Sequence, residues 1–254
     1  MNKTEEINLI TSYPKSGNTW LRFIIYLIYF HEANKELQSK MMDNSIPGLN
    51  KWSIAKIREN KHQFNPIFLK SHFSYNQVKK LNLGSIILVL RNPLDVLASL
   101  VRYYKIPEIN IENTVNEFCK FHNLSFLSKN FNFPSWSEHL DGWEKSNQKI
   151  LILKYNDLLD NFDLNIEKIV KFLNKKIDEN LIKTIKKKTD FETLKKLEKY
   201  EKEKAIDGYF FDLKKHNINF MSKGGTKTYM ELFSDNQIEK LNSTFNKYIT
   251  KYAL

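Results

Sequence analysis

A short loop at positions 12–20, SYPKSGNTW, holds polar and cationic side chains between an apolar run and a helical pattern. A glycine-containing loop that enters a helix points backbone N–H groups and the positive end of the helix dipole at its occupant, which is usually a phosphate. The side chains that could contact such an anion are Lys15, Ser16, Asn18 and Thr19. The same residue types suit an ordinary strand-to-helix turn with a hydroxyl cap, so the residues alone leave both interpretations open.

Two more stretches carry residues that suit anion chemistry. Arg91 follows the apolar run 85–90, and a planar guanidinium at the carboxyl end of a strand is well placed to bind a phosphate. His72 stands two residues after Lys70, at the end of another apolar run. Taken alone, Arg91 also suits a surface ion pair, and a lone histidine is more often structural.

Several motifs in this order resemble those of the cytosolic sulfotransferases. The string YPKSGNTW resembles their 5′-phosphosulfate loop, typically YPKSGTTW, and differs only at Asn18. RNPLDVLAS at 91–99 is similar to their RNPKDVAVS segment, and FLKSHF at 68–73 to their KTHLP segment. FMSKG at 220–224 is similar to their F-x-R-K-G loop, with Ser222 in place of the arginine. The resemblance implies a bound donor, 3′-phosphoadenosine 5′-phosphosulfate (PAPS), which carries phosphates at both ends of its ribose.

The resemblance also implies a donor site from residues scattered along the chain. YNDL at 155–158 looks like the family's YEDL element near the adenosine, and TDF at 189–191 like its TSF element at the adenine. The expected donor-binding residues are Lys15, Ser16, Gly17, Asn18, Thr19, Trp20, Arg91, Ser99, Tyr155, Thr189, Phe191, Ser222, Lys223 and Gly224. Ser222 removes one charge-assisted bond to the 3′-phosphate, and Lys223, Lys227 or Lys214 are candidates to compensate.

The catalytic roles that follow from the resemblance are those of an in-line sulfuryl transfer. His72 is expected to take the proton from an acceptor hydroxyl, while Lys15 and Lys70 stabilise charge on the sulfuryl group. Ser99 is expected to bind the 3′-phosphate and to restrain Lys15 until an acceptor is present. No metal is expected.

An acceptor pocket is harder to define from the sequence. WSEHLDGW at 136–143 looks like a family stretch whose histidine borders the acceptor, which suggests His139. Further aromatic candidates are Phe23, Trp52, Phe73 and Tyr75, each of which suits the hydrophobic core equally well. An aromatic pocket would favour a small, flat or apolar alcohol, phenol or amine.

The elements that must position these residues alternate between strands and helices. Strands are predicted at 7–11, 67–69, 85–90 and 149–154, and the last two are nearly continuous apolar runs of the kind buried on both faces of a parallel sheet. Helices are predicted at 19–31, 94–104, 158–174, 179–204 and 234–248. We therefore expect one domain over residues 1–254, a three-layer α/β/α fold with a central parallel sheet, similar to the P-loop NTPases.

Composition sets limits on the other classes of function. The single cysteine, Cys119, excludes an internal disulfide framework, and no apolar run reaches the length of a membrane span, so we expect a soluble cytoplasmic protein. The net charge of +11 permits an anionic partner but also suits lysine-rich, solvated helix faces. The sequence leaves open whether the chain is a monomer or a homodimer.

Two alternative functions remain at this stage. A P-loop nucleotide kinase or NTPase would share the sheet, but the Walker A order is absent because the lysine precedes the glycine. A basic protein that binds nucleic acid or another anionic polymer would use the positive charge directly, although it leaves the ordered motifs unexplained. Within the sulfotransferases, the acceptor could instead be a polysaccharide or a protein. Relatives with such acceptors are usually membrane-anchored, which this polar N-terminus does not support.

Overall fold

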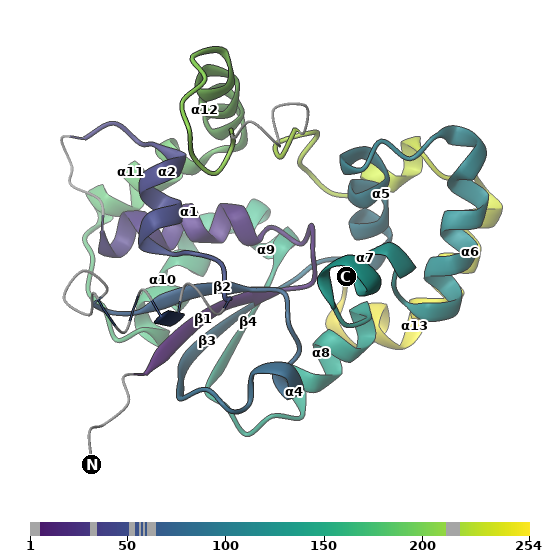
Figure 1. The fold of residues 1–254 in the computed structure, drawn as a ribbon, viewed down its shortest axis with the longest axis horizontal. Helices are drawn as coiled ribbons and strands as arrows, with labels where there is room; N and C mark the ends of the chain where they lie inside the picture. The colour runs from purple at the N-terminus through teal and green to yellow at the C-terminus, as the bar shows by residue number, and fades with distance from the viewer. Residues whose placement is uncertain are drawn as a thin grey trace.

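The computed structural model describes residues 6–30, 35–50, 54–55, 57, 59, 65–211 and 219–254. A four-stranded sheet forms its centre, with strands β1 (Ile7–Ser12), β2 (Phe68–Ser71), β3 (Leu83–Leu90) and β4 (Ile150–Lys154) in the order β2-β1-β3-β4 (Figure 1). All three pairings are parallel. The predicted α/β class and the four predicted strands are confirmed.

Alternate residues of the strands enter two separate hydrophobic clusters, one on each face of the sheet. Leu9 and Leu88 pack with helices α5 (Pro93–Tyr103), α6 (Ile111–Phe121), α8 (Trp136–Glu144) and α13 (Asp235–Tyr252). Ile10 and Ile87 pack with α1 (Asn18–Tyr29), α10 (Phe162–Phe172) and α11 (Glu179–Thr189) on the opposite face. Because successive side chains of a strand point to opposite faces, this alternation produces the three layers.

Most predicted helices are present, and two of them are divided. The predicted helix 158–174 consists of α9 (Tyr155–Asp160) and α10, and the predicted helix 179–204 consists of α11 and α12 (Phe191–Glu203). Asp190 makes the second break, because its carboxylate accepts hydrogen bonds from the Glu192 and Thr193 N–H groups and begins a new helix. At the C-terminus, a capping box of Ser234 and Gln237 begins α13, the helix predicted at 234–248.

Several elements of the structure were not predicted from the sequence. These are α2 (Ser39–Ser45), α4 (Tyr75–Val78), α6, α7 (Ser125–Phe131) and α8, and the short 3₁₀ helices η2 (Glu108–Asn110) and η3 (Thr228–Glu231). Helix α8 carries a signal that could have been used, since Ser135 and Glu138 form a capping box.

The carboxyl ends of the four strands lie at one edge of the sheet, as parallel pairing requires. The loop before α1, the segment of His72, Arg91 and Tyr155 follow β1, β2, β3 and β4 respectively. Open α/β sheets bind ligands at this edge. Within the described part of the chain, no helix is long and apolar enough to cross a membrane.

Candidate active site

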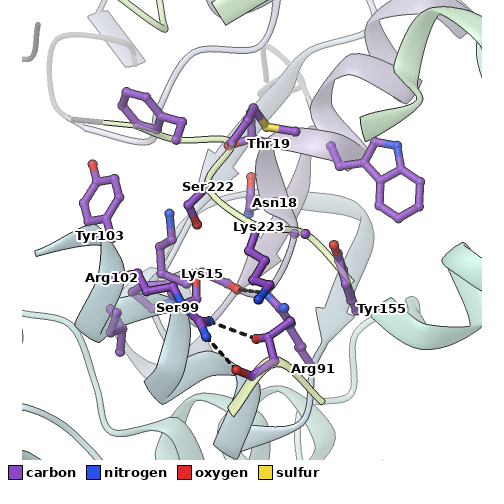
Figure 2. Close-up of a pocket in the computed structure, with 18 of the residues that line it drawn as sticks. Lys15, Asn18, Thr19, Arg91, Ser99, Arg102, Tyr103, Tyr155, Ser222 and Lys223 are labelled. Carbon is purple, nitrogen blue, oxygen red and sulfur yellow. Dashed lines mark hydrogen bonds between the residues drawn. The ribbon is translucent and has the colours of Figure 1, made fainter. Parts of the chain in front are cut away.

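A cavity of about 330 Å³ lies at this edge of the sheet and is lined by segments from across the chain. The sequence-predicted residues among its lining are Lys15, Gly17, Asn18, Thr19, Trp20, Lys70, His72, Arg91, Ser99, Tyr155, Thr189, Phe191, Ser222, Lys223 and Gly224. Figure 2 shows that Lys15, Arg91 and Lys223 point into this one space. Of the predicted donor-binding residues only Ser16 is outside the lining, and it is buried in the loop.

The loop after β1 takes a backbone shape that ordinary residues rarely adopt. Lys15 has a φ of 66° and Gly17 a φ of 102°, both in the left-handed region. A Cβ on Gly17 would also lie 2.7 Å from Cδ2 of Tyr155, so this position requires glycine. The loop therefore exposes its backbone at the N-terminus of α1, as an anion-binding loop does.

Asn18, the one departure from the family string in this loop, connects the ends of two strands. Its Nδ2 donates to the Ile10 carbonyl at 3.2 Å and lies within 3.4 Å of the Ser71 carbonyl. It also donates to the Ser12 hydroxyl at 3.2 Å. The side chain of Asn18 thus fixes the carboxyl ends of β1 and β2 beneath the cavity floor.

Arg91 joins three parts of the cavity wall. Its guanidinium donates to the backbone oxygen of Lys15 at 3.0 Å and to that of Gly225 at 2.9 Å. The same group lies 4.4 Å from the ring centroid of Tyr155. The side chain is buried, and its Nε has no hydrogen-bond partner among the residues that the structure describes. A buried guanidinium with an unused donor is suited to an anionic ligand.

Lys15 places its ammonium over the ring of Tyr103, 3.9 Å from the centroid. Burial and the neighbouring Arg91 guanidinium lower the pKa of Lys15 to about 7. Ser99 was expected to restrain Lys15, but among the residues that the structure describes no hydrogen bond joins these two side chains. The aromatic ring of Tyr103 stabilises the charged form of Lys15.

His72 has its ring orientation fixed by the backbone. Its Nδ1 lies 2.7 Å from the Ser12 carbonyl oxygen, and because a carbonyl only accepts, Nδ1 carries the proton. The neutral ring then presents Nε2 as an acceptor. Burial and the nearby Lys70 charge hold the pKa of His72 well below its usual value. The histidine is therefore a neutral base that lines the cavity.

Asp95 lies in the first turn of α5 and connects this helix to the C-terminal loop. The carboxylate is buried and accepts hydrogen bonds from the backbone N–H groups of Lys227 at 3.0 Å and Thr228 at 2.7 Å. It also accepts from the Thr228 hydroxyl at 3.1 Å. Helix α5 thereby holds the C-terminal loop, with its Ser222–Lys223–Gly224 segment, over the cavity.

Aromatic side chains form one end of the cavity. The ring centroids of Trp20 and Tyr155 are 5.7 Å apart in an edge-to-face arrangement, and Phe191 packs under Gly224. Thr189 lines the cavity but uses its hydroxyl to donate to the Ile185 carbonyl at 2.8 Å. This end supplies the flat apolar surface that a nucleotide base requires.

Two cationic side chains, Lys223 and Arg102, line the cavity together with Ser222. Lys223 forms an ion pair with Glu231, and Lys227 contributes its backbone N–H to Asp95. Arg102 lines the same cavity and donates to the Thr228 hydroxyl at 3.1 Å and to its carbonyl at 2.6 Å. Of the compensating residues considered from the sequence, Lys214 lies outside the described residues.

The expected acceptor residues that the structure describes lie outside the cavity lining. Phe23 is fully buried and packs on Phe210, with ring centroids 5.7 Å apart. His139 is buried, with its Nε2 3.2 Å from the Thr11 hydroxyl, and burial lowers its pKa to about 3. Tyr75 packs on Trp143, and Phe73 packs against the core. Trp52 lies outside the described residues.

A different set of apolar residues lines the half of the cavity beside His72. The sequence analysis did not select them: Tyr103, Tyr104, Phe131, Phe133, Tyr209, Phe220 and Met221. Phe133 contacts the ring of His72 at 5.2 Å between centroids. Arg102 could have been found, because it lies one helical turn after Ser99 on the same helix. Phe220 and Met221 lie in the FMSKG motif, and the other residues come from segments with no recognisable motif.

These features define a class of protein: an α/β enzyme with a nucleotide-binding loop at the carboxyl edge of a parallel sheet and a second, aromatic compartment beside a neutral histidine. Residues 6–253 match the sulfotransferase domain. The chain belongs to the sulfotransferase family, and its sulfuryl donor is PAPS.

Relatives of known activity match nearly the whole chain. Sulfotransferase 1B1 of Mus musculus is 29% identical, over 97% of this chain and 83% of the relative. The amine sulfotransferase of Oryctolagus cuniculus is 26% identical, over 99% and 83% respectively. The flavonol 3-sulfotransferase of Flaveria bidentis is 27% identical, over 94% and 80%.

Solved structures share the fold. Mouse sulfotransferase SULT7A1 complexed with 3′-phosphoadenosine 5′-phosphate (PAP) has a TM-score of 0.67 and 21% identity, over 98% of this chain and 86% of that one. Retinol dehydratase in complex with androsterone and PAP has a TM-score of 0.69 and 16% identity, over 98% and 82%.

Proposed function

We propose that this enzyme transfers the sulfuryl group of PAPS to a hydroxyl or amine of a small acceptor, with His72 as the general base. The observation that carries this proposal is the shared cavity, in which the loop after β1, the neutral His72 and the arginine after β3 meet. The acceptor oxygen or nitrogen attacks sulfur, the S–O bond to the 5′-phosphate breaks, and His72 accepts the proton.

The charged groups of the cavity are matched to that reaction. Lys15 and Lys70 stabilise charge on the sulfuryl oxygens and on the departing phosphate, since preorganised cations act most strongly where water is excluded. The 3′-phosphate lies with Arg91, Ser99 and Lys223, and the adenine lies between the aromatic side chains of Trp20 and Phe191. The match of residues 6–253 to one family supports a single domain over the chain.

The acceptor compartment favours a flat, apolar molecule with one nucleophilic group. Its walls are the rings of Tyr103, Tyr104, Phe131 and Phe133 beside His72. Relatives are named for amine, steroid and flavonol acceptors, which supports a small molecule without selecting one.

A thermal-shift titration followed by an acceptor screen tests the proposal. PAP should raise the unfolding temperature far more than AMP, because only PAP carries the 3′-phosphate. Radiolabelled sulfate from PAPS should then appear on a phenol, alcohol or amine without added magnesium or ATP turnover. Equal stabilisation by PAP and AMP, or transfer only from ATP, would refute the proposed donor and favour a nucleotide kinase.

A further inference from the structure

We propose that Arg102 binds the 3′-phosphate of the donor and supplies the guanidinium that is missing at Ser222. This inference rests on the proposed function, because it concerns the donor's second phosphate. Ser222 and Arg102 line the same cavity, together with Ser99, as Figure 2 shows. The C-terminal loop thus carries Ser222 where the family has an arginine, and Arg102 of helix α5 supplies a guanidinium from another wall of the same cavity.

The position of Arg102 on α5 directs it toward that phosphate. It lies three residues after Ser99, and side chains with this spacing share one face of a helix. Burial lowers the pKa of Arg102, the Asp95 carboxylate opposes that shift, and the charge of Arg91 adds to it, so Arg91 lies within electrostatic reach of Arg102. Both guanidinium groups line the cavity and can contact the same anion.

The other cations near Ser222 are less available. The ammonium of Lys223 is paired with Glu231, and its side chain is 46% exposed. The side chain of Arg102 is only 21% exposed, and its hydrogen bonds go to the neutral Thr228, with Glu231 at 4.0 Å. Thr228 takes bonds from two of the five N–H donors of this guanidinium, which leaves others for a phosphate.

A purely structural role for Arg102 must be separated from phosphate binding. Asp95 also holds Thr228 through two hydrogen bonds and the adjacent Lys227 through a third, so the C-terminal loop keeps a strong anchor when Arg102 is replaced. A loss of PAP affinity that Ser222→Arg reverses is therefore the informative readout, since a guanidinium at position 222 can replace a phosphate contact but not the bonds of Arg102 to Thr228.

The test compares the dissociation constants of PAP and AMP in the intact chain. Arg102→Gln should weaken PAP by about 10- to 100-fold, the usual size for a lost charged hydrogen bond, and leave AMP within about twofold. Lys105→Gln removes a nearby exposed cation outside the cavity and should leave both constants unchanged. The double variant Arg102→Gln with Ser222→Arg should recover most of the PAP affinity.

The outcomes distinguish this inference from the proposed function. If the unsubstituted chain fails to prefer PAP over AMP, the proposed donor itself is refuted. If the unsubstituted chain prefers PAP and Arg102→Gln keeps that preference, only the role of Arg102 is overturned. An equal loss of PAP and AMP affinity would assign Arg102 to loop structure, and Arg102→Lys provides a milder substitution if the glutamine variant fails to fold.

Discussion

His72 donates its Nδ1 proton to the main-chain oxygen of Ser12, 2.7 Å away. The bond crosses from the end of β2 to the end of β1 and fixes both the tautomer and the orientation of the ring. Its consequence is chemical, because an imidazole that donates through Nδ1 has its basic Nε2 available for the acceptor. The low pKa of this histidine keeps it unprotonated at neutral pH.

His72→Ala should lower kcat by ~10²–10⁴-fold, the range for the loss of a general base. PAP affinity should stay within about threefold of the unsubstituted enzyme, because His72 is expected to act on the acceptor and not on the nucleotide. Initial rates with PAPS and calorimetric PAP titrations measure the two effects. His122→Ala removes a histidine outside the cavity and serves as the control. Near-normal turnover in His72→Ala would exclude this histidine as the base.

The strands and the donor loops could be predicted because their signals are local. The run SIILVL at 85–90 is apolar after Ser85, as is typical of a strand covered on both faces, and Arg91 follows it directly. The break between α11 and α12 was missed because lysine and glutamate, which favour helices, are abundant on both sides of it, although Asp190 before Phe191 is a capping signal.

The aromatic compartment could not be predicted for a different reason. Phe133 and Tyr209 come from segments without helical or strand periodicity, and both face the cavity only because of long-range packing. For Phe23 the opposite holds. It was expected as a candidate of the acceptor pocket, but it lies on a face of α1 that packs in the hydrophobic core. The role of Asp95 was also hidden, because its partners Lys227 and Thr228 lie more than 130 residues away.

Asp95→Asn should reduce the free energy of unfolding by about 1–3 kcal/mol, because a buried carboxylate that accepts three bonds becomes an amide with fewer acceptor sites. Denaturant unfolding measures the change. Asp163→Asn makes the same change at an exposed ion pair with Lys186 and should cost well under ~1 kcal/mol. A loss for Asp95→Asn no larger than that for Asp163→Asn would show that Asp95 contributes little to loop anchoring.

PAP binding at pH 8 should be accompanied by proton uptake at Lys15. In the ligand-free protein its pKa is lowered to about 7, so above that pH most of the lysine is neutral. An anionic ligand favours the charged form and raises the pKa, which draws a proton from the buffer. Calorimetry in two buffers with different ionisation enthalpies measures this uptake, and Lys15→Met should abolish it. Binding enthalpies that are identical in the two buffers for the unsubstituted protein would contradict the prediction.

The adjacent glycines of the C-terminal loop offer a matched pair of substitutions. Gly224 and Gly225 have φ angles of 67° and 73°, so alanine costs a similar backbone strain of about 1 kcal/mol at either position. A Cβ on Gly224 would also lie 2.7 Å from the ring of Phe191, whereas nothing lies within 4 Å of one on Gly225. Because Phe191 is the expected adenine contact, Gly224→Ala should displace its ring and weaken both PAP and AMP by about tenfold more than Gly225→Ala does. Equal affinities of the two variants, measured by calorimetry, would show that Phe191 can move at no cost to nucleotide binding.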